Sequence, residues 1–164
     1  MDKTLGIYIH IPFCVQKCRY CDFTSYAGKS DEFKNRYVKS LINHIIMAST
    51  SRPAASLEPL GGRKVNSIFF GGGTPSLLNA SQMSEIMKAL RQHFDLTADC
   101  EITMEANPGT VTLESLTAYK QLGINRLSFG VQSMEDEILE GLGRIHRAEE
   151  AVRSIALARE AGFE

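Results

Sequence analysis

The amino-acid sequence predicts an α/β fold with parallel strands. Four short apolar segments, at residues 6–13, 65–70, 101–106 and 124–131, alternate with segments whose apolar residues recur at helical spacing. Strict alternation of strand and helix implies parallel strands joined by right-handed crossovers. Cysteines, a glycine run or polar residues lie at or just past the end of each strand, which is where barrel enzymes build their sites. A doubly wound sheet binds ligands mainly at one switch point, so we favour part of a (β/α) barrel.

The first strand and the first helix are indicated by composition and capping. Residues 6–13 form a nearly continuous apolar run, which is typical of a parallel strand buried on both faces. Ser30 stands before two acidic residues and is the expected N-cap of a helix over residues 31–48. Residues 49–64 contain prolines, glycines and hydroxyl side chains, and we expect a surface loop there with no domain boundary.

The remaining elements follow the same alternation. We expect strands at residues 65–70, 101–106 and 124–131, helices at residues 80–94, 113–122 and 147–161, and a short helical turn at residues 135–142. Ser81 is a candidate cap of the second helix. Gly123 and Gly162 stand where helices commonly end, because glycine adopts the left-handed conformation without a steric penalty.

Length and composition bound the function classes. The 164 residues make about one domain, and 43% hydrophobic with 23% charged residues is ordinary for a globular chain. The net charge of −1 indicates neither a nucleic-acid nor a membrane surface, and no window approaches the ~20 apolar residues of a membrane span. Four cysteines, three of them clustered, and an N-terminus without a signal peptide predict a cytoplasmic protein.

Residues 161–164 have the pattern of a helix end that leads into a further strand. Four strand–helix units cannot close a barrel, and they leave the fourth strand with an unpaired edge. We therefore expect the sequence to be the N-terminal part of a longer design, either a fragment or a truncated product.

Cys14, Cys18 and Cys21 lie within eight residues at C-x3-C-x2-C spacing. They are too crowded to pair with one another as ordinary disulfides. Thiolates suit zinc or iron–sulfur clusters, and a [4Fe–4S] cluster normally takes four ligands, so three cysteines leave one iron open. The alternative is a structural zinc site completed by His10 or another residue, although such ligands usually come as two separated pairs. Cys100 stands alone and is expected to be a small buried residue.

A run of three glycines, Gly71 to Gly73, follows the second strand and precedes Thr74. Without a Cβ, the backbone can approach a ligand closely. A tight strand-to-helix turn explains one or two glycines but hardly three, and a phosphate-binding loop is disfavoured because no Gly-Lys-Ser/Thr follows.

These motifs resemble the radical S-adenosylmethionine (radical SAM) superfamily, whose signature is C-x3-C-x2-C with an aromatic residue before the last cysteine, here Tyr20. The match continues through YIHIPFC (8–14), FFGGGTP (69–75), EANPG (105–109) and SFGVQS (128–133). The set resembles the branch that holds oxygen-independent coproporphyrinogen III oxidases (HemN) and HemW-type haem chaperones, and it covers nearly the whole chain. The resemblance implies a partial (β/α)6 TIM-like barrel. Residues 1–164 would be the N-terminal part of its core domain, with the remaining strands and a C-terminal domain absent.

The resemblance also implies the cofactors. Cys14, Cys18 and Cys21 would ligate three irons of a [4Fe–4S] cluster, while the amino and carboxylate groups of SAM chelate the fourth. The reduced cluster would pass an electron to the sulfonium and release a 5′-deoxyadenosyl radical, so the cofactor carries the chemistry and the protein supplies position. The residues that match SAM contacts are Tyr8, Tyr20, Gly72, Gly73, Thr74, Glu105, Gln132 and Arg144.

Each polar candidate also has a structural interpretation. Glu105 and Gln132 match polar contacts to SAM, or they are satisfied groups at strand ends. Arg144 matches a partner of the SAM carboxylate, or it is a solvated cation at a helix end. His10 either meets substrate or is a hydrogen-bonded core histidine. No residue is assigned a certain catalytic role.

One departure matters within this branch. The oxidase pattern carries a further cysteine two places after the third, where this sequence has Phe23. The departure resembles the HemW type and counts against oxidase activity, so enzymatic function stays open. The preferred function is a haem chaperone that transfers haem to an acceptor, with the HemW-type haem motif outside this chain. The alternatives are an oxidase that decarboxylates coproporphyrinogen III to protoporphyrinogen IX, and an inactive truncated fragment.

The implied partners follow from that branch. They are haem or a porphyrinogen, an electron donor such as flavodoxin or ferredoxin, and a haem-acceptor protein. Lys17 and Arg19 in the cysteine loop are expected to be solvated or to steer an acidic electron donor.

Overall fold

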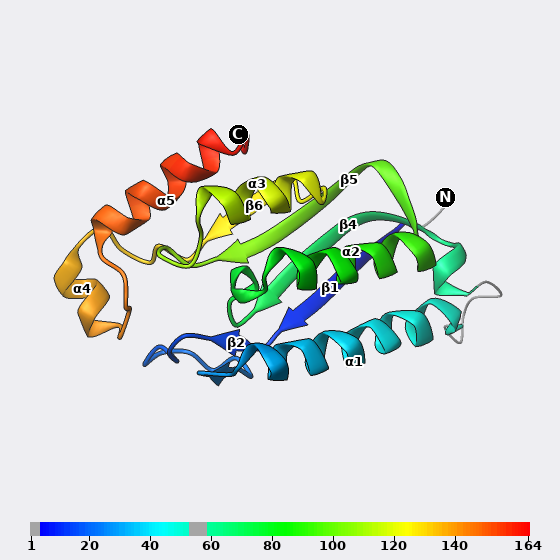
Figure 1. Cartoon of the computed structure of the whole chain (residues 1–164), viewed down its shortest axis with the longest axis horizontal. Helices are drawn as coiled ribbons and strands as arrows, with labels where there is room; N and C mark the ends of the chain where they lie inside the picture. Colours follow the sequence, from blue (N-terminus) through cyan, green and yellow to red (C-terminus); the bar gives the residue numbers. More distant parts are fainter. Residues whose placement is uncertain (1–3, 53–58) are drawn as a thin grey trace.

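The computed structural model describes residues 4–52 and 59–164, and within them the core is one four-stranded parallel sheet (Figure 1). Its strands are β1 (Leu5–Ile11), β4 (Lys64–Gly72), β5 (Asp95–Ala106) and β6 (Arg126–Phe129). They lie side by side in chain order, and every neighbouring pair is parallel. Sequential parallel strands are the arrangement of a barrel segment, whereas a doubly wound sheet reverses its order at a switch point. The predicted α/β fold is therefore confirmed.

The helices cover one face of this sheet. They are α1 (Asp31–Thr50), α2 (Ala80–His93), α3 (Leu113–Gln121) and α5 (Ala148–Glu160). The short α4 (Asp136–Gly141) lies beyond the carboxyl ends of the strands, and single 3-10 turns stand at η1 (Leu60–Gly62) and η2 (Pro75–Leu77) (Figure 1). Along the chain α1 packs on α2, α2 on α3, and α3 on α5. The buried strand residues alternate toward these helices, as Ile9 and Ile11 do on β1 and Ile102 and Met104 do on β5.

The opposite face of the sheet is not covered by helices, and the expectation that the first strand is buried on both faces is wrong. Tyr8 is 55% exposed although it lies between Ile7 and Ile9. It pairs in register with the half-buried Phe69, and the same row continues on β5 to Thr103, which is 1% exposed because the side chains of Glu101 and Arg126 contact it. An apolar run alone does not distinguish a strand buried on both faces from one with a solvated face.

The strands and loops near the cysteines differ from the predicted pattern. The connector at residues 24–30 contains a two-residue strand, β3 (Tyr26–Ala27), which pairs in parallel with β2 (Phe13–Cys14). β5 begins six residues before the predicted strand at 101. Of the predicted loop 49–64, residues 49 and 50 belong to α1, a 3-10 turn lies at η1, and residues 53–58 lie outside the described residues.

The caps are partly as predicted. Ser30 Oγ accepts a hydrogen bond from Phe33 N at 3.3 Å and caps α1. Helix α2 is capped by Asn79 and not by Ser81, because Asn79 and Gln82 exchange hydrogen bonds between side chain and backbone, each at 2.9 Å.

Both predicted C-terminal glycines have the left-handed backbone that ends a helix. Gly123 has φ 92° and Gly162 has φ 88°.

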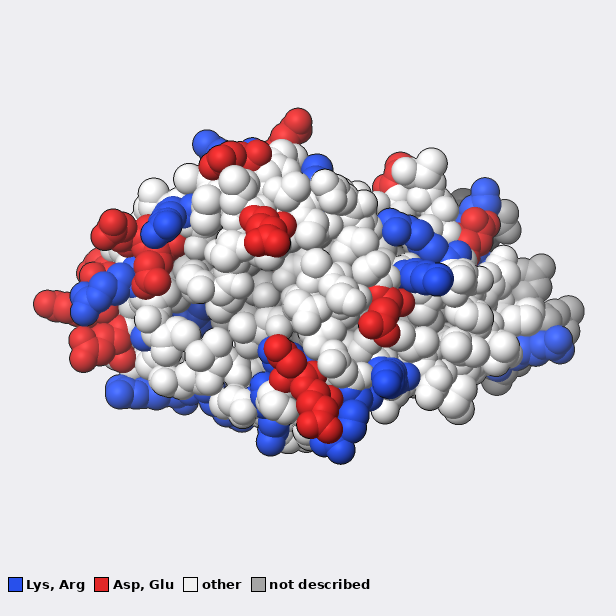
Figure 2. Space-filling view, in the orientation of Figure 1, with Lys and Arg blue, Asp and Glu red and all other residues white. Residues whose placement is uncertain are grey.

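Charges of both signs are interspersed on the face that Figure 2 shows, where acidic side chains gather over α4 and the first turn of α5. Within the described part of the chain, no helix has the length and apolar character of a membrane span.

Tyr119 ties the helical layer to the turn that follows β4. Its ring is 1% exposed, and its hydroxyl donates to the carbonyl oxygen of Leu78 at 2.6 Å and approaches that of Ser76 at 3.3 Å. Desolvation raises the pKa of Tyr119 to about 12. The neutral hydroxyl is therefore favoured by folding.

We expect Tyr119→Phe to lower the free energy of unfolding by about 1–2 kcal/mol at pH 7, because a buried carbonyl loses its donor. The folded pKa lies above the unfolded value of about 10, so the contribution is complete below pH 10 and is lost as the pH rises toward 12. Urea unfolding from pH 7 to 11 should show the gap between wild type and variant closing above pH 10.

Tyr26→Phe is the matched control, because Tyr26 is 49% exposed. An effect of Tyr119→Phe no larger than that of the control would contradict this account of the buried hydroxyl.

Candidate functional site

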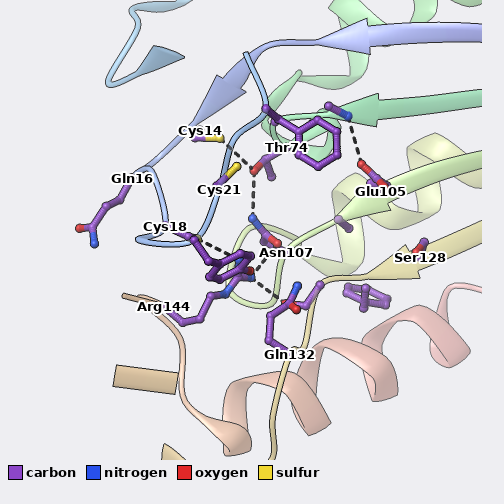
Figure 3. A pocket seen from close by; sticks show the side chains of 17 residues that line it. Cys14, Gln16, Cys18, Cys21, Thr74, Glu105, Asn107, Ser128, Gln132 and Arg144 are labelled. Carbon is purple, nitrogen blue, oxygen red and sulfur yellow. Dashed lines mark hydrogen bonds between the residues drawn. The ribbon is translucent and has the colours of Figure 1, made fainter. Parts of the chain in front are cut away.

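A cavity of about 280 Å³ lies at the carboxyl ends of the strands (Figure 3). Its walls come from the cysteine loop after β1, the turn after β4, the ends of β5 and β6, and the segment after α4. The predicted site residues that line it are Cys14, Cys18, Tyr20, Cys21, Gly72, Gly73, Thr74, Glu105, Gln132 and Arg144. Ten of the eleven predicted residues therefore meet at one place, although they are spread over the length of the chain.

Tyr8 is the exception, because it does not line this cavity. Its ring lies on the uncovered face of the sheet and stacks on Phe69 with the centroids 6.2 Å apart. Its hydroxyl is 3.1 Å from His10 Nδ1, and His10 Nε2 donates to the carbonyl oxygen of Thr24 at 2.9 Å. His10 is thus hydrogen-bonded on both ring nitrogens within the described residues.

The three clustered cysteines are half-buried free thiols, whereas Cys100 is buried, as predicted, at 6% exposure. Among the described residues, no three His, Cys, Asp or Glu side chains are arranged to hold a single metal ion. A [4Fe–4S] cluster does not need such a group, because each cysteine binds a different iron.

The cysteine loop is held by the segment that follows α4. Arg19 N donates to Leu142 O at 3.2 Å, and Arg19 Nη1 donates to Gly141 O at 3.3 Å. Gln16 Nε2 donates to Gly143 O at 3.3 Å. These carbonyls lie at a helix C-terminus, where acceptors lack intrahelical partners. The Arg19 guanidinium therefore braces the loop, which was not expected from the sequence.

Arg144 is a half-buried anchor and not a solvated cation. Its Nη1 donates to Cys18 Sγ at 3.3 Å, and its Nη2 donates at 2.7 Å to both Asn107 Oδ1 and Gly130 O. Its Nε is buried without a partner within the described part of the chain. The ring of His146 supports this arrangement, because Nε2 donates to Val131 O at 3.1 Å and leaves Nδ1 as an acceptor toward Arg144.

Asn107 is a site residue that the sequence analysis did not single out. Its Nδ2 donates to Thr74 Oγ1 at 2.9 Å, and the Thr74 hydroxyl lies 3.9 Å from Cys14 Sγ. The available signal was its position in the EANPG segment directly after a strand, where polar residues meet the cavity.

Glu105 brings a carboxylate to the same cavity. Its Oε2 accepts from Gly72 N at 3.1 Å. Burial raises the pKa of the Glu105 carboxyl above its ordinary value, while the Gly72 N–H and the nearby His10 lower it by less. The cavity is therefore lined by an acidic side chain, Glu105, and by a basic one, Arg144.

The glycine run is explained by packing of the turn against the first strand and the short strand after it. A Cβ on Gly72 would lie 2.5 Å from the His10 ring, and a Cβ on Gly73 would lie 2.6 Å from Phe13 O. Gly72 also has φ 112°. The tight-turn interpretation thus accounts for these two glycines without a ligand.

Gln132 is held in a strained conformation three residues after the end of β6. Its φ of 70° makes it the one non-glycine residue with positive φ in the described parts of the chain. Such backbone costs about 1–3 kcal/mol and is found where the surroundings enforce it, commonly at functional sites.

The donors present fit an iron–sulfur cluster with a small zwitterionic ligand beside it. Three soft sulfur atoms line the cavity. Arg144 offers a guanidinium to a carboxylate, and its buried Nε is an unused donor. Glu105, which is hydrogen-bonded to Gly72 in the turn after β4, offers a carboxylate to the amino group of such a ligand.

Comparison with known proteins identifies the family of the chain. The sequence model of the Radical SAM superfamily matches residues 8–164. The chain is 47% identical over 159 residues to the haem chaperone HemW of Escherichia coli and 45% identical over 159 residues to that of Haemophilus influenzae. In each case the match covers 97% of this chain and 40% of the relative. The chain thus spans about two fifths of the length of these relatives.

A solved structure has the same fold. Coproporphyrinogen III oxidase (HemN) from Escherichia coli superposes with a TM-score of 0.87 at 33% identity, over 99% of this chain and 36% of that chain.

We expect Gly143→Ala to loosen the cysteine loop. Gly143 has φ 74°, and an added Cβ would lie 3.0 Å from Arg19 Cγ and 3.4 Å from Arg19 N. The Arg19 amide would lose its bond to Leu142, and its hydrogen exchange should become about tenfold faster. Exchange mass spectrometry of the peptide over residues 14–21 checks this.

Gly162→Ala imposes a similar backbone strain at φ 88°, but its Cβ would lie 4.0 Å from its nearest neighbour, Lys120 Cε. Faster exchange of the cysteine loop in both variants, or in neither, would contradict the assignment of residues 141–143 as its support.

Proposed function

Because the chain belongs to the radical SAM superfamily, we propose that it binds a [4Fe–4S] cluster and S-adenosylmethionine and acts as a HemW-type haem chaperone. One observation carries the cofactor proposal. Cys14, Cys18 and Cys21 line a single cavity together with the guanidinium of Arg144 and the carboxylate of Glu105. Thiolates select iron–sulfur clusters, and the two charges complement the carboxylate and amino groups of an amino acid.

The residues have separate proposed roles. The three cysteines hold the cluster, and Arg144 and Glu105 orient the two charged groups of SAM. Gly73 and Thr74 form the wall between them, while Gln132 and the half-exposed ring of Tyr20 face the nucleoside. When bound, the cluster and SAM supply one-electron chemistry to a partner molecule.

Position 23 favours the chaperone over the oxidase. The Phe23 side chain is 63% exposed and lines the cavity, so it places an apolar ring where the oxidase pattern has a thiol. The two haem chaperones are also more similar in sequence than the oxidase, at 47% and 45% against 33% identity. The proposed partners are therefore haem, a haem-acceptor protein and a small electron donor such as flavodoxin or ferredoxin. Free clustered thiols are consistent with the reducing cytoplasm.

The second candidate is an oxygen-independent oxidase that decarboxylates coproporphyrinogen III. The observation that favours it is the close superposition on the coproporphyrinogen III oxidase HemN, with a TM-score of 0.87. The proposed domain assignment, part of a radical SAM core over residues 1–164, is the same for both candidates.

The two candidates differ in whether coproporphyrinogen III stimulates the cleavage of SAM. Because the HemW-type haem motif is expected outside this chain, haem retention is measured on a longer protein that includes the motif, and we expect that protein, anaerobically reconstituted, to retain haem through gel filtration. We also expect no increase in 5′-deoxyadenosine when coproporphyrinogen III and a reductant are added. Phe23→Cys should give no such increase either, because one thiol does not rebuild a substrate site.

Formation of 5′-deoxyadenosine in proportion to the coproporphyrinogen III consumed would contradict the chaperone proposal and favour the oxidase. A protein of these 164 residues that aggregates and retains no iron would support the inactive fragment instead. Cys18→Ser is the control for cluster-dependent signals, and Cys100→Ser is its match at a cysteine outside the cavity.

A further inference from the structure

We propose that Asn107 is a positioning residue that links two cluster cysteines through one side-chain amide, Cys18 by way of Arg144 and Cys14 by way of Thr74. We call the three residues Arg144, Asn107 and Thr74 the relay. The inference deepens the proposed function and rests on it, because it assigns the relay a role toward a cluster at these thiols.

The position of Asn107 in the fold suits this role. It directly follows β5, and β5 lies between β4 and β6 in the sheet. Thr74 follows β4, and Gly130, whose carbonyl also accepts from Arg144, follows β6. The amide therefore stands at the centre of the rim, within reach of both neighbouring strand ends (Figure 3).

The chemistry of the partners fixes the direction of every bond in the relay. Arginine can only donate, so the amide oxygen of Asn107 faces Arg144 Nη2 at 2.7 Å. The amide nitrogen then faces Thr74 Oγ1 at 2.9 Å and donates to it. The Thr74 hydroxyl has one hydrogen, and its oxygen is already accepting from Asn107. That hydrogen points to Cys14 Sγ at 3.9 Å.

Each end of the relay donates a hydrogen bond to a cysteine sulfur. Arg144 Nη1 donates to Cys18 Sγ at 3.3 Å, and Thr74, which is 2% exposed, donates to Cys14 Sγ. Within the residues that the structure describes, no hydrogen-bond donor reaches the sulfur of Cys21. The relay therefore distinguishes two of the three cysteines from the third.

The space around Asn107 is fitted to this amide. A Cβ on Gly130 would lie 2.6 Å from Asn107 Oδ1 and 3.5 Å from Arg144 Nη2, so the absence of a side chain there makes room for the pair. Leucine has a similar shape but can neither accept from Arg144 nor donate to Thr74. Aspartate can accept from Arg144 but has no hydrogen for Thr74.

Hydrogen bonds to the cysteine sulfurs of an iron–sulfur cluster raise its reduction potential, because the reduced form carries more negative charge. The relay should make the bound cluster easier to reduce than the same three thiolates would without donors. A brace that only stabilised the strand ends would change the free energy of unfolding and leave the potential unchanged.

The test is a redox titration of the reconstituted protein, followed by EPR in the absence of SAM. We expect Asn107→Leu and Thr74→Val each to lower the reduction potential. The ratio of oxidised to reduced cluster at a fixed potential should rise about three- to tenfold, and tenfold corresponds to ~59 mV for one electron. Thr74→Ser, which keeps the hydroxyl, should restore the wild-type value. The double variant should shift little more than Asn107→Leu alone, because both changes break one relay.

Asn125→Leu is the matched control. The Asn125 side chain also makes two bonds to β5, accepting from Ile102 N at 2.8 Å and donating to Cys100 O at 2.9 Å, but it contacts no clustered cysteine. We expect it to lower stability and to leave the potential unchanged.

The outcomes separate the two proposals. A wild-type protein that takes up iron and sulfide, with the same potential in all variants, would overturn the relay and leave the proposed function intact. A wild-type protein that takes up no cluster would contradict the proposed function, and this inference with it. If Asn107→Leu does not fold, the pair Thr74→Val and Thr74→Ser still decides the question.

Discussion

The hydrogen bond between Arg144 and Asn107 is the contact on which the site depends. At 2.7 Å it joins the segment after α4 to the end of β5, and the other guanidinium nitrogen reaches Cys18. Three parts of the chain that are distant in sequence therefore meet at one half-buried cation. The amide of Asn107 also donates to Thr74, so the loss of this contact would also displace the hydrogen bond to the turn after β4. A charged group that is partly removed from water makes strong hydrogen bonds and is costly to leave without them.

The cysteine loop depends on contacts with residues 141–143 because it has little support of its own. Val15, Tyr20 and Phe23 are each about half exposed or more, so the loop contributes few side chains to the core. Its order comes from polar contacts to carbonyls 122 and 127 residues further along the chain, and from pairing of β2 with β3. A loop held in this way can be positioned accurately and yet remain accessible from the cavity.

The fold could be predicted from the sequence because each parallel strand is a short apolar segment that is recognisable from its own residues. Apolar runs of strand length, each followed by glycine or polar residues, predicted the four strands and the rim where the site lies. The spacing of Cys14, Cys18 and Cys21 predicted a shared site because three thiols within eight residues cannot separate far. The side on which the helices pack could not be read from β1, where Tyr8 lies on a solvated face despite apolar neighbours.

What the sequence could not supply were contacts made across the rim. Asn107 looks like a turn residue before proline, and its two side-chain partners are set only by the register of β4, β5 and β6. Arg19 looks like a solvated loop cation, and its acceptor is a helix end more than a hundred residues away. The strained backbone of Gln132 likewise has no local signature, because glutamine rarely adopts positive φ.

The measurement that tests the account most directly is EPR of the anaerobically reconstituted and reduced protein, recorded with and without SAM. The account predicts a reduced-cluster signal whose shape changes when SAM is added, since the cavity holds both the three cysteines and the charged groups proposed to bind SAM. A protein that retains zinc and forms no cluster would contradict the account, and so would a cluster signal that is identical with and without SAM.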